Sequence, residues 1–247
     1  MKIGILIPCT SKGKDWSNFE DIYLYYITLK SFLTTYDSEH SYTFYIGIDN
    51  DDPIFTNRYI IPQFKKCVRA MNDVQINFTY FNNIPKGHLT KMWNILFKKA
   101  YEDNCDYFFQ CGDDISFQTK GWINACIHML QKNNNIGVTS PICINNKLIL
   151  TQTFVSRKHM DIFGFYFPEE IINWGCDDWI NIVYKPEYFY PLSNYTCNNL
   201  GGQPRYVIDN NSGFNNQWQK NLYELRNKIN KLVEDTYKPI LNKYITI

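Results

Sequence analysis

The first 140 residues alternate short apolar runs with longer segments whose apolar residues recur at helical spacing, and this alternation restricts the possible folds more than any other feature. Runs with the length and content of buried strands occur at 3–9, 42–48, 75–81, 106–111 and 136–140. Helical patterns separate them, at 19–33, 62–71, 89–101 and 122–130. Because strands separated by helices favour right-handed βαβ units, the sequence predicts an α/β fold with a mostly parallel, doubly wound sheet.

The residues beyond 140 show a weaker pattern. We expect a hairpin over 142–154 with Asn145 and Asn146 at its turn, and a helix that begins near Asp177. An Asn- and Gly-rich loop over 198–213 precedes an amphipathic C-terminal helix over 218–233. This helix is expected to pack on the core, and docking to a partner or a membrane surface is the alternative. Because we find no internal repeat and no Pro/Gly-rich linker, we predict one domain.

The composition argues against several classes of protein. The 247 residues are 45% hydrophobic and 20% charged, as in globular proteins, and a net charge of +1 disfavours a nucleic-acid binder. No apolar run reaches the roughly 18 residues of a transmembrane helix, and the opening apolar run is too short for a signal peptide. With no Cys-x-x-Cys pair among eight cysteines, we expect buried thiols and a cytoplasmic location. The scarcity of alanine, with abundant Ile, Asn, Lys and Tyr, is typical of an AT-rich genome such as that of a large DNA virus.

Polar clusters follow three of the predicted strands, at 10–14, 49–52 and 112–114. Ligands of doubly wound sheets bind beyond the carboxyl ends of the strands, where these clusters are expected to meet. The adjacent carboxylates of Asp113 and Asp114 suit a hard cation such as Mg²⁺ or Mn²⁺, which proteins bind through one or two carboxylates. An Asp-rich turn without a ligand is the alternative.

The segment 106–122, DYFFQCGDDISFQTKGW, resembles the acidic metal motif of glycosyltransferases with the GT-A fold. In that family a carboxylate pair follows a hydrophobic strand; here Gly112 stands in the first acidic place and Asp114 in the last. The resemblance implies a single GT-A-like, Rossmann-like domain that binds Mn²⁺ or Mg²⁺ through Asp114 and Asp113. Its parts would be a nucleotide-sugar half (1–115), an acceptor half with a lid loop (116–213) and the C-terminal helix (214–247).

The resemblance also implies a set of residues that contact the donor. They come from the loops after the first two strands, from a basic element before the helix at 89–101, and from the lid loop, where Arg205 would pair with phosphate oxygens. Ordinary turns, solvated charges and a surface loop are the alternatives for these segments. The implied nucleotide-sugar-binding residues are Pro8, Thr10, Asp49, Asp51, Lys86, Lys91, Asp113, Arg205 and Tyr206.

The segment 167–180, FPEEIINWGCDDWI, resembles the acceptor-side segment of the same superfamily, in which an acidic residue that opens a helix is the general base. A sugar hydroxyl must lose a proton as it attacks the anomeric carbon, and a carboxylate can accept it. We favour Asp177 over Asp178 as this base. A helix N-cap is the alternative, and one aspartate could cap while the other serves as base. Direct displacement with a single base predicts inversion of the anomeric centre.

Together these features predict metal-dependent transfer of a sugar from a nucleotide-diphosphate sugar, expected to be a UDP-sugar, to a hydroxyl of a glycan or another acceptor. One alternative is a sugar-phosphate nucleotidyltransferase, although the single glycine of 11–14 disfavours its Gly-rich phosphate loop. Another is a catalytically degenerate module that binds a nucleotide or a glycan. Gly112 and the lack of any histidine after His159, where many family members supply a metal ligand, favour this module; the acidic residues together disfavour it.

Overall fold

The structure is a computed structural model that describes residues 1–85, 87–202 and 218–246, the last range without the side chains of 218–222. The strands of these residues all belong to one sheet. They are β1 (Lys2–Cys9), β2 (Ser41–Asp49), β3 (Val74–Phe81), β4 (Tyr107–Gln110), β5 (Ile115–Phe117), β6 (Val138–Cys143), β7 (Thr153–Ser156) and β8 (Phe189–Asn199).

The sheet has the order β3-β2-β1-β4-β7-β6-β8-β5 and two differently built halves. Strands β3, β2, β1 and β4 are parallel to one another, as the predicted βαβ units require. In the other half, β7 is antiparallel to β4 and to β6, β8 is parallel to β6, and β5 is antiparallel to β8. The predicted α/β fold with a mostly parallel sheet is therefore confirmed, and the antiparallel strands are added to it.

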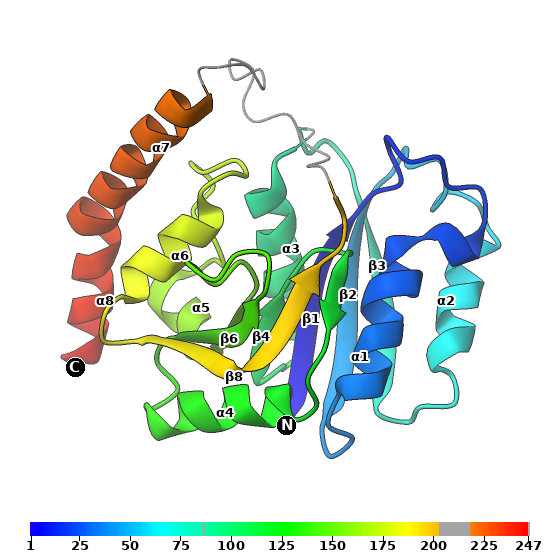
Figure 1. Ribbon diagram of the computed structural model, residues 1–247, viewed down its shortest axis with the longest axis horizontal. Coiled ribbons are helices and arrows are strands. Elements are labelled where there is room, and N and C mark those ends of the chain that lie inside the picture. Colours follow the sequence, from blue (N-terminus) through cyan, green and yellow to red (C-terminus); the bar gives the residue numbers. More distant parts are fainter. Residues whose placement is uncertain (86, 203–217, 247) are drawn as a thin grey trace.

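Helices cover both faces of the sheet (Figure 1). Side chains of Ile3, Ile5 and Ile7 on one face of β1 belong to a core cluster with α1, α2 and α4, whereas Leu6 on the other face belongs to a cluster with α3, α5 and α6. Because alternate side chains of a strand point to opposite faces, both sets of helices bury apolar surface of the same strand. The helices are α1 (Lys30–Thr35), α2 (Ile60–Val68), α3 (Leu89–Glu102), α4 (Trp122–Lys132), α5 (Lys158–Phe163) and α6 (Cys176–Tyr184).

The C-terminal helix is longer than the sequence pattern indicates. It runs through α7 (Trp218–Leu232), a π-helical turn (Val233–Tyr237) and α8 (Lys238–Ile245) along one side of the domain (Figure 1). Its buried side chains recur every four residues at Ile229, Val233, Tyr237 and Leu241 and join the cluster of α3 and α6. The prediction that this helix packs on the core is confirmed.

Several local predictions are wrong. The helix predicted over 19–33 is split into a 3₁₀ turn (Phe19–Asp21), a π-helical segment (Leu24–Leu29) and α1. In place of a hairpin over 142–154, a tight turn is closed by a bridge from Cys143 to Asn146, and β7 then pairs mainly with β4. Strands β5 and β8 and helix α5 are additional to the prediction. Strand β8 gives little signal because only Leu192 and Cys197 of its side chains are buried.

All eight cysteines lie in the described residues as thiols, and seven of them are buried, as predicted. In residues 1–85, 87–202 and 218–246, helices of the length and apolarity needed to cross a membrane do not occur.

Candidate active site

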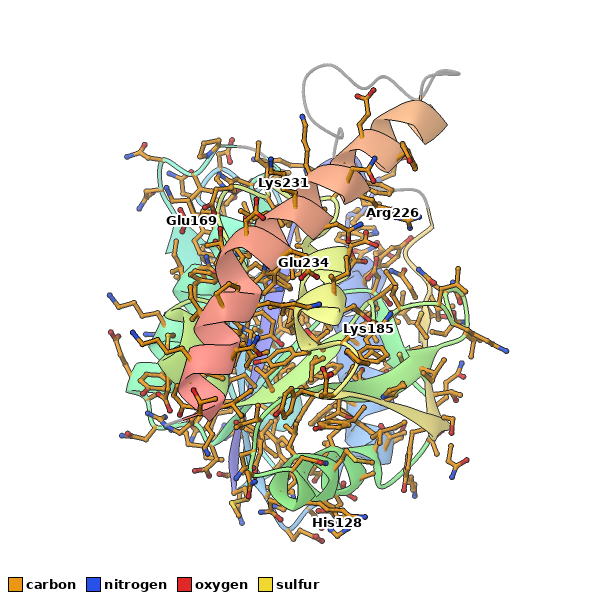
Figure 2. All side chains as sticks on the ribbon, turned by 90° about the vertical axis from the view of Figure 1, so that its left-hand side faces the viewer. His128, Glu169, Lys185, Arg226, Lys231 and Glu234 are labelled. Carbon is orange, nitrogen blue, oxygen red and sulfur yellow. The ribbon has the colours of Figure 1, made fainter. Side chains whose placement is uncertain are left out.

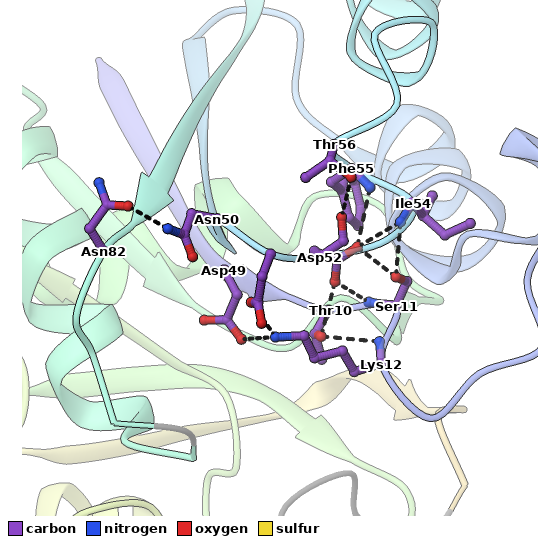
Figure 3. A network of polar contacts seen from close by, with 11 residues as sticks. Thr10, Ser11, Lys12, Asp49, Asn50, Asp52, Ile54, Phe55, Thr56 and Asn82 are labelled. Carbon is purple, nitrogen blue, oxygen red and sulfur yellow. Dashed lines mark hydrogen bonds and ion pairs between the residues drawn. The ribbon is translucent and has the colours of Figure 1, made fainter.

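The loops after β1 and β2 are held together by the Asp52 carboxylate (Figure 3). Asp52 is 0% exposed, and it accepts hydrogen bonds of 2.5 to 3.2 Å on both oxygens. The donors are the hydroxyls of Thr10 and Ser11 and the backbone N–H groups of Ser11, Ile54 and Phe55. Because this buried charge is satisfied by the protein itself, Asp52 fixes the shape of the sheet edge.

Lys12 lies over the same edge and contacts the two other carboxylates of the second loop. Its Nζ atom lies 3.2 Å from Asp49 Oδ2 and 2.5 Å from Asp51 Oδ1. Figure 3 shows Lys12 next to Asp49. Burial lowers the pKa of Lys12, but the hydrogen bonds to Asp51 and Asp49 raise it overall. The structure thus brings Thr10, Asp49 and Asp51 together at the carboxyl end of the parallel strands, where the sequence places them.

Asp113 and Asp114 join β4 to β5, and their surroundings differ. Asp113 is fully buried, and the Cys9 thiol donates a hydrogen bond to its Oδ2 atom (3.0 Å). Asp114 is partly exposed, and its backbone carbonyl accepts a hydrogen bond from Leu200 N (2.9 Å). Of the two residues, only Asp114 is partly exposed to solvent.

Two glycines make room for the Asp114 carboxylate. A Cβ atom at Gly112 would lie 2.6 Å from Asp114 Oδ1, and a Cβ atom at Gly201 would lie 1.8 Å from Oδ2. Since real Cβ atoms essentially never approach that closely, a side chain at either position would displace the carboxylate. This gives a physical reason for glycine at position 112, the first acidic place of the family motif.

Asp177 and Asp178 lie in the first turn of α6, but neither is its N-cap. The N-cap is Gly175, whose φ of +89° is a left-handed conformation that glycine adopts readily. A Cβ atom at Gly175 would also lie 2.2 Å from Ile229 Cδ1 on α7. Glycine at this position therefore allows α7 to pack closely against the start of α6. The alternative in which one of the two aspartates is the N-cap of this helix is therefore wrong.

The two aspartates of α6 have different partners. Asp178 Oδ1 lies 3.4 Å from Arg226 Nε on α7, which crosses α6 in Figure 2. Asp177 Oδ1 accepts a hydrogen bond from Asp178 N (3.1 Å). Burial, and then the negative charge of Asp178, raise the pKa of Asp177 to about 6. Asp177 therefore changes its charge near neutral pH.

A cavity of about 310 Å³ connects the acidic turn to the start of α6. Gly112, the residue before Asp113 and Asp114 in the sequence, lines it on one side, and Asp177 lines it from α6. The position of α6 at this cavity is fixed by Asn181, which exchanges two hydrogen bonds of 2.8 Å with the backbone of Leu150 and donates one to Asp177 O (2.7 Å). Two regions that are more than 60 residues apart in the sequence thus share one cavity.

The sequence analysis misses the uncharged side chains of this cavity. They include Trp93, Gln110, Gln152 and Trp174, which come from α3, β4, the residue before β7 and the turn before α6. Helical spacing marks Trp93 only as a core residue, and the two glutamines carry no local pattern. Only the fold brings them together.

The remaining predicted residues lie apart from this cavity or outside the described residues. Pro8 is buried within β1, next to Gly47 of β2 in the strand register. Lys91 is partly buried in the first turn of α3. Lys86, Arg205 and Tyr206 lie outside the described residues.

Among the two residues of the acidic turn, only Asp114 is partly exposed, so it is the carboxylate that we test against a metal ion. In the described part of the chain, no group of three or more His, Cys, Asp or Glu side chains is arranged to hold a metal ion. Asp114 alone still fits Mg²⁺ or Mn²⁺ when phosphate oxygens and water supply the other ligands. His159 does not belong to the site, because its ring contacts Tyr184 Oη (2.8 Å) and Tyr166 O (3.0 Å), and burial lowers its pKa to about 4.

Comparison with known proteins supports the fold. Neither a protein-family model nor a curated protein sequence matches this chain. Residues 1–349 of S. aureus TarS in complex with UDP match with a TM-score of 0.54 and 13% identity, over 80% of this chain and 60% of that one. A second structure of that fragment matches with a TM-score of 0.53 and 13% identity, over 79% of this chain and 60% of that one. A structure of TarS matches with a TM-score of 0.53 and 12% identity, over 79% of this chain and 36% of that one. This chain therefore matches well under two thirds of TarS, and the likeness shows that its fold is the GT-A-like α/β domain that the sequence predicted.

Proposed function

We propose that this protein transfers a sugar from a UDP-sugar to a hydroxyl group of an acceptor, with Asp177 as the general base and a divalent cation at Asp114. The observation that carries the proposal is the shared cavity: Gly112 of the acidic turn and Asp177 of α6 line the same 310 Å³ space. A transferase of this kind needs a donor diphosphate and a proton acceptor on either side of one anomeric carbon.

The electrostatics of Asp177 suit the role of base. A general base works best when its pKa lies near the operating pH, and the pKa of Asp177 is raised to about 6, chiefly by burial. At pH 7 most of the population carries the carboxylate form that can accept a proton. Asp178 is already paired with Arg226, which makes it a poorer candidate than Asp177.

The donor nucleotide is proposed to bind at the carboxyl ends of β1 and β2. Thr10, Asp49 and Asp51 lie there at the end of β2 and on the two loops that Asp52 holds together by hydrogen bonds. The UDP of the TarS complex supports a uridine nucleotide as the first one to test.

Asp114 would hold the Mn²⁺ or Mg²⁺ ion together with oxygens of the donor diphosphate. The cation supplies neutralisation of the charge that develops on the leaving group. The contribution of Asp113 is indirect, because its side chain is buried and accepts a hydrogen bond from the Cys9 thiol. A single base opposite the leaving group favours direct displacement, so we propose that the anomeric centre is inverted.

The deciding experiment incubates the protein with a panel of UDP- and other nucleotide sugars, Mn²⁺ or Mg²⁺, and a mixture of simple glycan acceptors. Release of free nucleoside diphosphate with a glycosylated product supports the proposal. Exchange of pyrophosphate would instead indicate a nucleotidyltransferase, and tight binding without turnover a binding module. The NMR coupling constant of the anomeric proton shows the anomeric configuration of the product. A product with the same configuration as the donor would overturn the inverting mechanism.

A further inference from the structure

Two cysteines lie side by side at the ends of neighbouring strands, and no step of the proposed reaction uses them. Cys143 ends β6, and its partner in the parallel register with β8 is Cys197. Register partners of a parallel sheet point to the same face, and both side chains belong to the core cluster of α1, α2 and α4. Neighbouring strands lie about 4.8 Å apart, within the roughly 4.4–6.8 Å that separates the Cα atoms of a disulfide. The backbone therefore allows these two residues to be joined.

The two thiols of this pair have different surroundings. The hydrogen bond with Cys197 lowers the pKa of the Cys143 thiol by more than burial raises it. The backbone N–H groups of Asn145 and Asn199 also donate to Cys143 and lower its pKa further. The same contact, with burial, raises the pKa of Cys197. Cys143 is therefore the residue that carries the thiolate, and Cys197 carries the proton.

The other thiols of the chain are less suited to oxidation than Cys143. Cys9 donates its proton in a hydrogen bond to Asp113 Oδ2 (3.0 Å). Burial is the largest influence on five more thiols, and it raises the pKa of Cys67, Cys105, Cys111, Cys126 and Cys176. Because the thiolate is the form that reacts with peroxides, the chemistry favours Cys143 over all of them.

The pair adjoins the cavity of the candidate active site. Cys197 Sγ lies 3.4 Å from Gln152 Oε1, and Cys143 accepts from the N–H group of Asn199. Both Gln152 and Asn199 line the cavity. The two cysteines are themselves buried, with 2% of Cys143 and 0% of Cys197 exposed. A reagent that reaches them from the cavity must be small and uncharged, as hydrogen peroxide is.

From this arrangement we propose that Cys143 and Cys197 form a redox site, at which hydrogen peroxide joins the two sulfurs in a reversible disulfide. The Cys143 thiolate attacks one peroxide oxygen, the O–O bond breaks, and hydroxide leaves with the electron pair, so that Cys143 becomes a sulfenic acid. The Cys197 thiol then attacks the sulfenic sulfur, the S–O bond breaks, and the thiol proton leaves with the hydroxyl group as water. Two molecules of glutathione, which leave as their own disulfide, restore both thiols.

Mass spectrometry of the oxidised protein tests the proposal directly. We expect wild-type protein treated with hydrogen peroxide to lose two hydrogen atoms, with the linkage mapped between Cys143 and Cys197, and glutathione to restore the original mass. Cys67→Ser is the matched control: it removes the one thiol that is not buried, and it should leave this linkage unchanged. Oxidation of Cys67 while Cys143 and Cys197 stay reduced, or a linkage between other cysteines, overturns the inference.

The order of the two chemical steps gives a second measurement. In Cys197→Ser the serine hydroxyl can still donate to Cys143, but no thiol remains to displace the hydroxyl group, so the sulfenic acid should persist and react with dimedone. In Cys143→Ser, dimedone labelling of Cys197 should be at least about tenfold weaker, because its thiolate is scarce. Equal labelling of the two variants rejects the inference. If either variant fails to fold, the wild-type linkage decides: its formation supports the redox site and its absence rejects it. Neither measurement involves sugar transfer, so the redox site and the proposed function stand or fail separately.

Discussion

Asp52 and Asp177 are two partly or wholly buried carboxylates that the protein surrounds in opposite ways. Asp52 accepts hydrogen bonds from two hydroxyls and three backbone N–H groups in the loops after β1 and β2. Asp177 accepts one backbone hydrogen bond, faces a cavity, and has Asp178 as its neighbour. Protein groups donate to both oxygens of the first carboxylate, whereas burial and the charge of Asp178 raise the pKa of the second to about 6.

The difference indicates that Asp52 stabilises the fold, whereas Asp177 is suited to a role in catalysis. Protein donors already use both oxygens of Asp52, so few lone pairs remain for a ligand. Removal of this side chain should therefore lower the free energy of unfolding. The ionised form of Asp177 is disfavoured by burial and by a like charge, which is a cost that a protein tolerates where it serves function. Substitutions at the two positions should therefore affect different measurements.

The largest effect is expected for Asp177→Asn. The amide keeps the size of the side chain but cannot accept the acceptor's proton, so the transfer rate should fall by roughly 10²–10⁴-fold while the donor Kd stays unchanged. Because the folded-state pKa is raised above the usual 3.8, ionisation of Asp177 destabilises the fold, a cost that is complete only above about pH 6. The variant should consequently unfold at an equal or higher temperature than the wild type at pH 8.

Steady-state kinetics and calorimetric melting of Asp177→Asn and Asp178→Asn measure both effects. If Asp178→Asn loses transfer and Asp177→Asn retains it, the roles of the two aspartates are exchanged. A wild-type transfer rate in both variants would mean that this segment has no part in catalysis.

Asp114→Ala is expected to have the next largest effect. Loss of the accessible carboxylate should weaken the Mn²⁺-dependent binding of a nucleoside diphosphate by about a hundredfold without unfolding the chain, since the metal contributes several kcal/mol of charge stabilisation. Titration calorimetry with UDP, with Mn²⁺ and with a chelator, measures the effect. An affinity that keeps its metal dependence in the variant would show that the cation, if any, binds elsewhere.

Asp52→Ala should reverse the pattern and reduce stability. Two hydroxyls and three backbone N–H groups lose a charged acceptor, which should cost about 3 kcal/mol of the free energy of unfolding and lower the melting temperature by roughly 6–12 °C. Asp51→Ala is the matched control in the same loop, because its side chain is 59% exposed and it forms an ion pair with Lys12. Equal melting temperatures for the two variants would contradict the structural role of Asp52.

The sequence predicts the parallel half of the sheet well because its signals are local. Strands β1, β2 and β4 are nearly continuous apolar runs, as expected of strands buried on both faces, and α3 has one apolar face. The antiparallel half depends on pairing between distant strands. Strand β8 is mostly polar and exposed, and it is held by β6 on one side and β5 on the other, which no local pattern reveals.

In the candidate site too, some residues can be predicted from local sequence and others depend on contacts between distant segments. Asp114 and Asp177 are found from the sequence because each lies in a recognisable segment next to a strand end or a helix start. The central role of Asp52 depends on Thr10 and Ser11, more than 40 residues away, and the cavity beside Asp177 is lined by residues that are far apart in the sequence. Contacts of this kind appear only in three dimensions.

The smallest expected effect belongs to Arg226→Ala, which tests how finely the charge on Asp177 is set. The positive charge of Arg226 lowers the pKa of Asp177, although less than burial and Asp178 raise it. Removing that charge should move the midpoint of the pH–rate profile upward, and by less than about half a pH unit because the arginine is 58% exposed and screened by solvent. Transfer should fall measurably at pH 6, where fewer molecules hold the carboxylate form, and stay constant at pH 8.

Lys231→Ala is the matched control: it removes the same charge from an exposed position on α7, away from Arg226 in Figure 2. A midpoint that moves downward, or one that moves equally in both variants, would show that Arg226 does not act on the titration of Asp177.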